Sequence, residues 1–590
     1  MRKTKIICTL GPASNNEEII EKLIASGMDI ARFNFSHGDH EGHLKTFRAV
    51  EKIRQKFSKP VGTLLDTKGP EVRLCIFEKG KIFLKEGNKF ILKSDSSVMG
   101  NENECAITYP LLYQDVEIGN RILVDDGLIE LKVTEIAGTD IICTVINGGE
   151  LSDRKSINIP DVKLSLPFIS KRDEEDILFG IKTGFDFIAA SFTRTADDIL
   201  QIRKILSDHN CSTIKIIAKI ENSQGVENID EILRVSDGVM VARGDMGVEI
   251  PIQDVPVIQK KIIKKAYMAG KHVITATQML DSMIRNPRPT RAEAADVANA
   301  IYDGTSAIML SGETASGKYP VEAVKTMALI AERTEKDVNY KSNYFSNNEL
   351  ISSGFNDITY AISHATCTTA YDLDAAAIIT VTHSGHTARM CSRFRVDKPI
   401  IACTPSEHTF RHLSMSWGVT PVMVTYRDNY EDLFNHAVEV VSNAGFVRDG
   451  ELVVLTAGVP IGVAGTTNLL KVQMVGDVIL RGKSLVKKNV ISTVCVCDDK
   501  NEALSKFKDG NILVIPKADE TILPILQKAS AIITENTAEN SYEAIVGKAL
   551  NVPTIIGASN ACSILKNGST IMINGEKGMI CNCAKKINNI

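Results

Sequence analysis

The segments AKIEN (Ala218–Asn222) and VARGDMGVEIP (Val241–Pro251) decide which fold this chain can adopt. Each closes a short apolar run, and such a run is typical of a strand that is buried on both faces. Each also delivers a carboxylate where its strand ends, Glu221 in the first segment and Asp245 in the second. Two carboxylates at one rim of strand ends suit a hard divalent cation that keeps open positions for substrate oxygens.

Lys219 lies two residues before Glu221 in the first segment. A lysine beside a bound cation adds positive charge where a phosphoryl group or an enolate gathers negative charge. Two unrelated surface salt bridges are the alternative interpretation. The position of both carboxylates at strand ends favours a functional site.

Eight apolar runs alternate with amphipathic helical patterns, which predicts an α/β fold with a closed parallel (β/α)8 TIM barrel. The predicted strands are Lys5–Thr9, Asp29–Asn34, Val61–Asp66, Phe187–Ser191, Lys215–Lys219, Gly238–Ala242, His272–Ala276 and Ala307–Leu310. The predicted helices include Glu17–Ser26, His43–Phe57, Ala196–Ser207 and Gln253–Ala269. Polar residues at the strand ends are the active-site candidates: Arg32, Asn34, Asp66, Thr67, Ser191, Lys219, Glu221, Arg243, Asp245 and Thr277.

The pattern of alternating strands and helices divides the chain of 590 residues into four parts. Residues 1–69 and 168–345 form the predicted barrel. Residues 70–167 change to short alternating strands with turn signals, which predicts an inserted β-barrel lid; a passive insertion is the alternative. Residues 346–480 predict a C-terminal open α/β domain, and residues 483–590 predict an appended α/β domain that follows a linker after Arg481.

Composition indicates a globular enzyme of the cytoplasm. The chain is 44% apolar and 24% charged, and its formal net charge of −4 supplies no basic surface for nucleic acid. The N-terminal stretch of residues 1–14 is basic but lacks the apolar core of a signal peptide, and no apolar stretch approaches membrane length. We therefore expect no membrane partner and a cytoplasmic location. The thirteen cysteines are expected to be free thiols, with a metal site at the C-x-C pairs Cys495/Cys497 and Cys581/Cys583 as the alternative.

Long motifs over roughly the first 480 residues resemble the pyruvate kinase family. They are KIICTLGPAS (Lys5–Ser14), ARFNFSHG (Ala31–Gly38), LLDTKGPEVR (Leu64–Arg73), the two opening segments, the stretch Thr275–Pro320 and TVTHSGHTAR (Thr380–Arg389). The resemblance implies a phosphotransferase that converts phosphoenolpyruvate and ADP to pyruvate and ATP in the last step of glycolysis. It also implies an inserted lid, an effector-binding α/β domain and a homotetramer.

The resemblance assigns roles to individual residues of the barrel and the lid. Glu221 and Asp245 match the ligands of Mg²⁺ (or Mn²⁺), and Lys219 matches the group that stabilises the phosphoryl group in flight. The remaining substrate contacts implied are Arg32, the backbone amides of Gly244 and Asp245, and Thr277, near which the enolpyruvate is protonated with the help of water. The nucleotide contacts implied are Asn34, Phe35, Ser36, His37, Arg73 and Lys155.

A second cation is implied by the match of Asn34, Ser36, Asp66 and Thr67 to the family's K⁺ ligands. An all-oxygen set with one carboxylate suits such a weakly charged ion. Glu71 occupies the position at which potassium-independent members carry a lysine, and a carboxylate cannot replace the ion. We therefore predict K⁺ dependence.

The turn Thr380–Arg389 places backbone N–H groups at a predicted helix N-terminus, which suits an anion; an ordinary helix cap is the alternative. The resemblance identifies it as the family's loop for a phosphorylated allosteric effector, a sugar phosphate or AMP, bound by Thr382, Ser384, Gly385, His386 and Thr387. His386 departs from the more usual lysine or arginine. The segment Gly462–Asn468 matches a second loop of the same pocket.

The appended part resembles the swivelling phosphohistidine domain of phosphoenolpyruvate-utilising enzymes, over Ile533–Gly557. Tyr542, preceded by Ser541, falls where the acceptor histidine would be. A phenol lacks the imidazole nitrogen that forms the labile phosphoramidate, so we expect a structural or interface role.

Two other functions remain open. A barrel aldolase or mutase acting on phosphoenolpyruvate or pyruvate would share the metal site but would not need Arg73, Lys155 or a lid. A catalytically silent sensor would use the effector pocket alone, and the presence of Lys219, Glu221, Asp245 and Thr277 argues against it.

Overall fold

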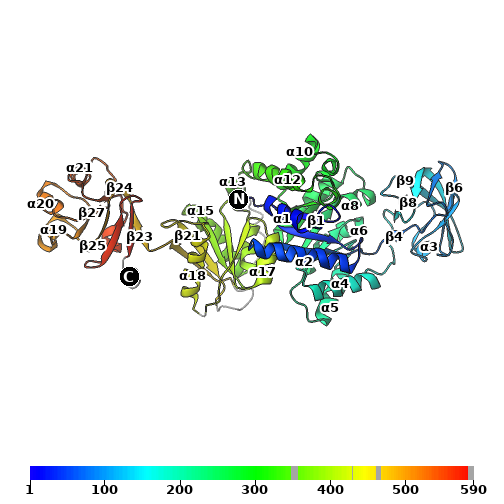
Figure 1. Cartoon of the computed structure of the whole chain (residues 1–590), viewed down its shortest axis with the longest axis horizontal. Helices are drawn as coiled ribbons and strands as arrows, with labels where there is room; N and C mark the ends of the chain where they lie inside the picture. Colours follow the sequence, from blue (N-terminus) through cyan, green and yellow to red (C-terminus); the bar gives the residue numbers. More distant parts are fainter. Residues whose placement is uncertain (347–356, 428, 460–466, 583–590) are drawn as a thin grey trace. The chain divides into compact units, whose positions relative to one another are not determined.

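The computed structural model describes residues 1–346, 357–427, 429–459 and 467–582 (Figure 1). Contacts divide the chain into two compact units, each described by itself below. The first unit comprises Met1–Tyr360 and Thr382–Met423, and the second comprises Ala361–Val381 and Val424–Ile590. Within the described ranges, no helix is both long enough and apolar enough to cross a lipid bilayer.

Eight parallel strands close into a barrel in the first unit, which confirms the predicted (β/α)8 fold. They are β1 (Lys5–Leu10), β2 (Ile30–Asn34), β3 (Gly62–Asp66), β13 (Phe187–Ala190), β14 (Lys215–Ile220), β15 (Gly238–Ala242), β16 (His272–Ala276) and β17 (Ala307–Leu310). Most of these strands are buried along their whole length, because side chains fill the barrel on one face and helices cover the other. Ile7, Leu64, Phe187 and Met240 belong to the cluster that fills the interior.

Several helices of the barrel begin after a residue whose side chain caps the first turn. The α-helices of the first unit, outside the insertion and the later open sheet, are α1 (Glu17–Ser26), α2 (His40–Lys56), α4 (Lys171–Thr183), α5 (Ala196–Asp208), α6 (Ser223–Glu227), α7 (Ile229–Val235), α8 (Arg243–Glu249), α9 (Val255–Met268), α10 (Arg291–Tyr302), α11 (Gly312–Ala315), α12 (Pro320–Glu335) and α13 (Tyr340–Ser346). Among those capped in this way are α1, α2, α4, α6 and α10. Helix α2 begins three residues earlier than predicted, because the Asp39 side chain accepts a hydrogen bond from the backbone N–H of Gly42.

The insertion after β3 forms a β structure with its own apolar core. Its elements are β4 (Val72–Arg73), β5 (Lys81–Leu84), β6 (Lys89–Lys93), β7 (Glu104–Ala106), α3 (Leu112–Asp115), β8 (Arg121–Val124), β9 (Ile129–Ala137), β10 (Asp140–Asn147), β11 (Gly149–Ser152) and β12 (Ser156–Asn158). The sheet order is β4-β12-β8-β9-β10-β6-β7, with β11 and β5 paired separately. Strands β4 and β12 are the entry and the exit of the insertion, and their pairing closes it at the barrel.

An open α/β sheet follows the barrel, with strand order β20-β19-β18-β21-β22. Its elements are α15 (Ile358–Asp372), β18 (Ala377–Val381), α16 (His386–Arg393), β19 (Ile400–Thr404), α17 (Glu407–His412), β20 (Val419–Met423), α18 (Tyr430–Asn443), β21 (Leu452–Ala457) and β22 (Leu469–Met474). Edge strand β22 runs antiparallel to β21.

The last part of the second unit is an eight-stranded sheet, in the order β23-β30-β29-β25-β26-β27-β28-β24. Its elements are β23 (Val478–Arg481), β24 (Lys483–Ser484), β25 (Asn489–Val496), α19 (Lys500–Lys506), β26 (Ile512–Ile515), α20 (Leu523–Leu526), β27 (Ala531–Thr534), α21 (Tyr542–Ala549), β28 (Thr554–Ile556), α22 (Ala561–Ile564), β29 (Thr570–Asn574) and β30 (Met579–Asn582). The prediction of a linker after Arg481 is wrong. The chain there continues from β23 into β24, and backbone pairing with β30 and β28 holds both strands in the sheet.

Candidate active site

Lys219 is the centre of a buried cluster of charges at the carboxyl ends of the barrel strands. Its Nζ lies 3.0 Å from Glu221 Oε1 and 3.2 Å from Asp66 Oδ1, and it donates a hydrogen bond of 2.8 Å to Ser191 Oγ. Burial alone would lower the pKa of Lys219, but the surrounding carboxylates of Asp66, Glu221 and Asp245 raise it above its ordinary value. Lys219 therefore keeps its positive charge at neutral pH.

Arg32 is a second cation of this cluster. Its Nε donates a hydrogen bond of 2.6 Å to Asp66 Oδ2, and its Nη1 donates one of 2.8 Å to Thr9 Oγ1. Asp66 therefore lies between Arg32 and Lys219, and only 1% of its surface is exposed. Burial raises the pKa of Asp66, but the charges of Arg32 and Lys219 outweigh that effect and hold it below the ordinary value. Asp66 is thus a fixed anion that positions both cations.

Glu221 is fully buried, and its two carboxylate oxygens have different surroundings. Oε2 accepts a hydrogen bond of 2.5 Å from the backbone N–H of Phe192. Oε1 is close to Lys219 but receives no hydrogen bond of acceptable geometry from any described residue. Burial raises the pKa of Glu221 to about 7; Lys219 opposes this rise and the charge of Asp245 adds to it. A buried carboxylate that has one oxygen without a hydrogen bond and that lies near the charge of a second carboxylate fits a divalent cation.

Asp245 belongs to the first turn of α8, directly after strand β15. The positive end of a helix dipole lies at such a turn and favours a bound anion. Among the described residues there is no group of three or more His, Cys, Asp or Glu that could hold a metal ion. Glu221 and Asp245 are two carboxylates that could serve as cation ligands at this rim.

Thr277 follows strand β16 with a left-handed backbone, at φ +69°. Such a conformation is unfavourable for a β-branched residue and is found most often at functional sites. The Thr277 hydroxyl accepts a hydrogen bond of 2.7 Å from the Gly244 N–H, and its carbonyl accepts one of the same length from Arg243 Nη2. The Gly244 amide, which the family resemblance assigns to the substrate carboxylate, therefore has Thr277 as its partner in this structure.

The four predicted K⁺ ligands come from adjacent strands. Parallel register pairs Asn34 at the end of β2 with Asp66 at the end of β3. Asn34 Oδ1 accepts a hydrogen bond of 3.1 Å from the Ser36 N–H, and Thr67 Oγ1 lies 3.2 Å from the Ala189 carbonyl oxygen. The structure thus brings Asn34 and Asp66 to neighbouring strand ends, and Thr67 directly follows Asp66.

The predicted nucleotide residues divide between the barrel and the lid. Phe35 and His37 follow β2, and the Phe35 carbonyl accepts a hydrogen bond of 3.0 Å from Arg172. Antiparallel pairing of β4 with β12 brings Arg73 beside Ser156, the residue after Lys155. Arg73 Nε donates a hydrogen bond of 2.7 Å to Glu71, and Lys155 Nζ lies 2.8 Å from Asp125.

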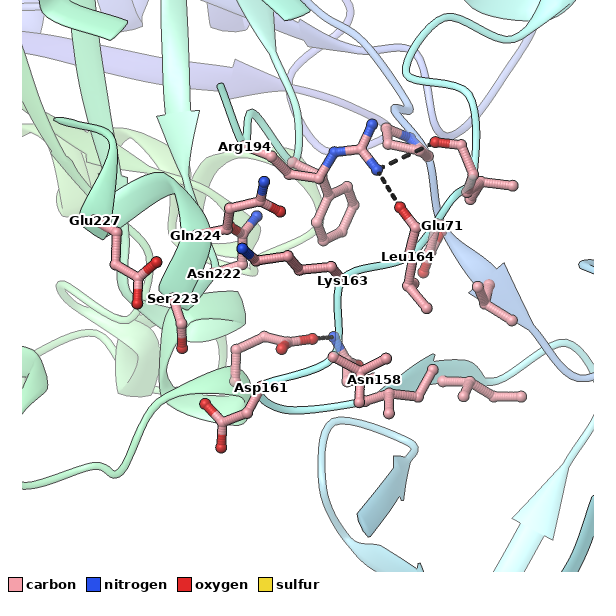
Figure 2. Close-up of a pocket in the computed structure, with 18 residues that line it drawn as sticks. Glu71, Asn158, Asp161, Lys163, Leu164, Arg194, Asn222, Ser223, Gln224 and Glu227 are labelled. Carbon is pink, nitrogen blue, oxygen red and sulfur yellow. Dashed lines mark hydrogen bonds between the residues drawn. The ribbon is translucent and has the colours of Figure 1, made fainter. Parts of the chain in front are cut away.

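A cavity of about 210 Å³ lies between the lid hinge and the barrel (Figure 2). Arg194 donates hydrogen bonds from its Nη1 to the carbonyl oxygens of Leu164 and Leu166, at 3.0 and 3.1 Å. Asn158, from β12, donates one of 2.8 Å to Glu249. These bonds hold the second lid connection, which follows β12, to the barrel.

The predicted effector loop precedes helix α16. Gly385 has φ +75° as the residue before the helix, and its N–H donates a hydrogen bond of 3.0 Å to Thr382 Oγ1. Ser384 accepts a hydrogen bond of 3.1 Å from Arg389 at its carbonyl oxygen, and burial lowers the pKa of His386. Most of the second predicted loop, residues 462–466, lies outside the described residues.

The two predicted C-x-C pairs show no metal-binding geometry in the part of the chain that the structure describes. Cys495 and Cys497 are both buried, and their sulfur atoms lie 3.7 Å apart as free thiols. The last cysteine of the second pair, Cys583, lies outside the described residues.

Two members of the buried cluster were not assigned a role from the sequence. Ser191 Oγ lies 3.0 Å from Asp66 Oδ1 and accepts from Lys219, so it joins the anion to the cation. Thr9, at the end of β1, binds Arg32. Both residues had a sequence signal, because each ends a predicted barrel strand, but only the contacts show what each one binds.

Comparisons with known proteins cover almost the whole chain. Family models match at residues 1–324 (pyruvate kinase, barrel domain), 360–473 (pyruvate kinase, alpha/beta domain) and 507–578 (PEP-utilising enzyme, mobile domain). Pyruvate kinase of Geobacillus stearothermophilus is 48% identical over 582 residues, which is 98% of each chain. Pyruvate kinase of Bacillus licheniformis is 48% identical, over 98% of this chain and 99% of the relative. A crystal structure of a pyruvate kinase from Cryptosporidium parvum is similar at a TM-score of 0.76 and 40% identity, over 80% of this chain and 96% of that one.

Proposed function

The chain belongs to the pyruvate kinase family of phosphotransferases, and from this premise we propose how its own residues carry out the reaction. The substrates proposed are phosphoenolpyruvate and ADP, and the products are pyruvate and ATP. The observation that carries the proposal is the position of Lys219, a buried cation between Asp66 and Glu221 at the rim of the barrel. We also propose, from the family resemblance, that the enzyme works in the cytoplasm as a homotetramer.

Phosphoryl transfer breaks the bond between phosphorus and the enol oxygen and forms a bond to the terminal phosphate of ADP. Lys219 and Arg32 stabilise the negative charge on the phosphoryl group, and Lys219 also stabilises the enolate that remains. Because ionic bonds to Asp66 fix both cations beforehand, little reorganisation is needed when the charge develops. The lid carries Arg73 and Lys155 for the nucleotide and excludes water when it closes.

The substrate carboxylate is proposed to bind at the first turn of α8, at the amides of Gly244 and Asp245. Binding there requires the Thr277 hydroxyl to leave the Gly244 N–H, and this movement frees the hydroxyl. Thr277 then positions a water molecule that protonates the enolate carbon to give pyruvate.

Two cations complete the proposed site. Glu221 and Asp245 would hold Mg²⁺ (or Mn²⁺), which supplies Lewis-acid stabilisation of phosphoryl and enolate oxygens when bound. Asn34, Ser36, Asp66 and Thr67 would hold K⁺. The Glu221 oxygen that accepts no hydrogen bond supports the first assignment, and the pairing of Asn34 with Asp66 at neighbouring strand ends supports the second.

The direct test measures pyruvate formation from phosphoenolpyruvate with ADP and Mg²⁺, in KCl and in NaCl, for the wild type and Lys219→Met. Loss of one group that stabilises transition-state charge reduces kcat by about 10²–10³-fold or more. Turnover without ADP would favour an aldolase or mutase. Absence of turnover in the wild type, with retained ligand binding, would favour a sensor.

We further propose that a phosphorylated effector, a sugar phosphate or AMP, binds the loop of Thr382, Ser384, Gly385, His386 and Thr387. The backbone turn at Gly385 and the start of α16 support an anion site. The test is titration of activity with AMP and with glucose 6-phosphate. Ser384→Asp adds a negative charge that repels phosphate, so its activation curve should move to higher effector concentration; an unchanged curve would contradict the site.

A further inference from the structure

A second, larger cavity lies at the opposite end of the barrel from Lys219. It is formed beside residues 301–304, which precede strand β17, and it has a volume of about 550 Å³. We call it the basal cavity. Its aromatic lining residues are Tyr267, Tyr340, Tyr344, Phe394 and Trp417. Cavities of this size are typical of small-molecule sites, and aromatic walls of this kind bind planar rings.

Arg395 is the cation in the wall of the basal cavity. Its Nη2 donates hydrogen bonds to the Gly304 carbonyl at 2.9 Å and to Ser306 Oγ at 3.1 Å. Its Nε and Nη1 are buried and have no hydrogen-bond partner among the described residues. Since unpaired buried donors are unfavourable, these two N–H groups indicate a missing acceptor.

The charge state of Arg395 is unusual. Its left-handed φ of +51° belongs to the turn that ends helix α16. Burial lowers the pKa of Arg395 to about 10, and Tyr340, Tyr267 and Glu335 offset only part of this effect. An anion bound beside the guanidinium would offset more of it.

The nearby carboxylates already have other partners. Asp303, the acidic residue that lines the basal cavity, accepts hydrogen bonds from Lys260 and from Gln259. Glu335 accepts from the backbone N–H groups of Lys3 and Thr4, at 2.8 and 2.6 Å. Neither carboxylate forms an ion pair with Arg395.

A smaller cavity adjoins the basal cavity, and its wall contains further cationic side chains. It shares Arg395 and Trp417 with the basal cavity, and Lys271 and Arg389 also line it. Burial lowers the pKa values of both Lys271 and Arg389. No aspartate or glutamate lines this smaller cavity within the described part of the chain.

Trp417 brings the charged and aromatic parts of the wall together. The Arg395 guanidinium lies 4.6 Å from the centre of its ring, and the ring of Tyr340 lies 5.2 Å away. We propose that the basal cavity binds a small organic anion that carries a planar ring. Arg395 binds the anionic group, Lys264 adds positive charge at the rim, and the tyrosines and Trp417 contact the ring.

The test uses Trp417 as its own reporter, because it is the single tryptophan of the chain. The full-length protein is titrated with phenyl phosphate, which has a ring and an anion, and its tryptophan fluorescence is recorded. Inorganic phosphate, which has no ring, and phenol, which has no charge, serve as matched probes. A saturable change is expected with phenyl phosphate, at an affinity about tenfold or more above that of either control probe.

Arg395→Met should weaken phenyl phosphate binding about tenfold or more, since a charge-assisted hydrogen bond is lost. If this variant does not fold, Lys264→Glu carries the test, because Lys264 is exposed and its charge reversal disturbs no core. Lys261→Glu is the matched control, an exposed lysine of the same helix that does not line the cavity.

Three outcomes would overturn the proposal. The first is the absence of a saturable change with phenyl phosphate. The second is equal binding of inorganic phosphate, which would remove the role of the aromatic wall. The third is loss of the signal in Ser384→Asp, which would show that the ligand binds the proposed effector loop and that Trp417 reports it from a distance.

Discussion

Asn158 in the lid and Glu249 in the barrel are joined by a hydrogen bond of 2.8 Å, from Nδ2 to Oε1 (Figure 2). Asn158 ends β12, the last strand of the lid, and Glu249 ends α8, whose first turn carries Asp245. One short helix thus connects a lid contact with a proposed metal ligand. We therefore expect a movement of the lid to shift the turn that is proposed to receive the substrate.

Loss of this bond should reduce catalysis without removing any group that touches substrate. Asn158→Ala removes the donor, and we expect kcat/KM to fall about threefold to tenfold, since a net hydrogen bond contributes about 1 kcal/mol. Asn158→Gln, which keeps an amide donor, should recover part of the loss. An unchanged kcat/KM for both substrates in Asn158→Ala would contradict the coupling.

The same pair predicts a pH dependence of stability. Burial raises the pKa of Glu249, and the bond from Asn158 only partly opposes this rise. The folded state therefore keeps the Glu249 proton to a higher pH than the unfolded state, whose pKa is about 4.3. This contribution to stability is present below about pH 4.3 and is lost as the pH rises through the folded pKa. Glu249→Gln should thus gain stability relative to the wild type between acidic and neutral pH, as measured by denaturant unfolding at each pH; a constant difference would contradict it.

Lys219→Met should also destabilise the barrel, apart from its effect on turnover. Asp66 retains Arg32 as a partner, but Glu221 loses the only cation within 3.0 Å that the structure gives it among the described residues. Breaking one side of a buried ion pair costs about 3–5 kcal/mol. The thermal unfolding midpoint should fall, and it should fall less with Mg²⁺ than with EDTA, because the cation offsets the charge of Glu221. Lys261→Met is the control; equal midpoints in Lys219→Met and wild type would argue against a buried pair.

The dependence of enzymatic activity on K⁺ should change when the charge of the side chain at position 71 is changed. The wild type should lose most of its activity when NaCl or tetramethylammonium chloride replaces KCl at equal ionic strength. Glu71→Lys introduces an ammonium group near the proposed K⁺ ligands and should retain more activity without potassium. Because Glu71 also accepts a hydrogen bond from Arg73, Glu71→Gln controls for loss of that ion pair. Full wild-type activity without potassium would refute the assignment.

The last domain should not carry a phosphoryl group. Tyr542 begins α21, and the next residue, Glu543, is buried and accepts hydrogen bonds from the Ala518 N–H and from Asn536 Nδ2. These contacts hold α21 in place. Tyr542, at the position of the acceptor, has no imidazole nitrogen that could be phosphorylated. Incubation with phosphoenolpyruvate labelled on phosphorus should therefore leave no acid-labile label on this domain, as tested by proteolysis and mass spectrometry. Labelled peptide from residues 533–557 would contradict this prediction.

The barrel could be predicted because its signals are local. The run Gly238–Ala242 is a strand at the predicted bounds, and α1 has the predicted bounds Glu17–Ser26. Alternation of such runs implies closure of the sheet. The strand β24 was missed because it has only two residues, Lys483 and Ser484, and it is a strand only through pairing with β28.

The sequence by itself determined which residues end the barrel strands, and hence that Glu221, Asp245 and Lys219 share one rim. Apolar periodicity and strand order are properties of neighbouring residues, so they can be read along the chain. Only the tertiary structure decided that Asp66 lies between Arg32 and Lys219, that Asn158 binds Glu249, and that Arg395 packs on Trp417. These contacts join residues far apart in the chain. Their distances depend on how the barrel closes and how its elements pack, which no local pattern encodes.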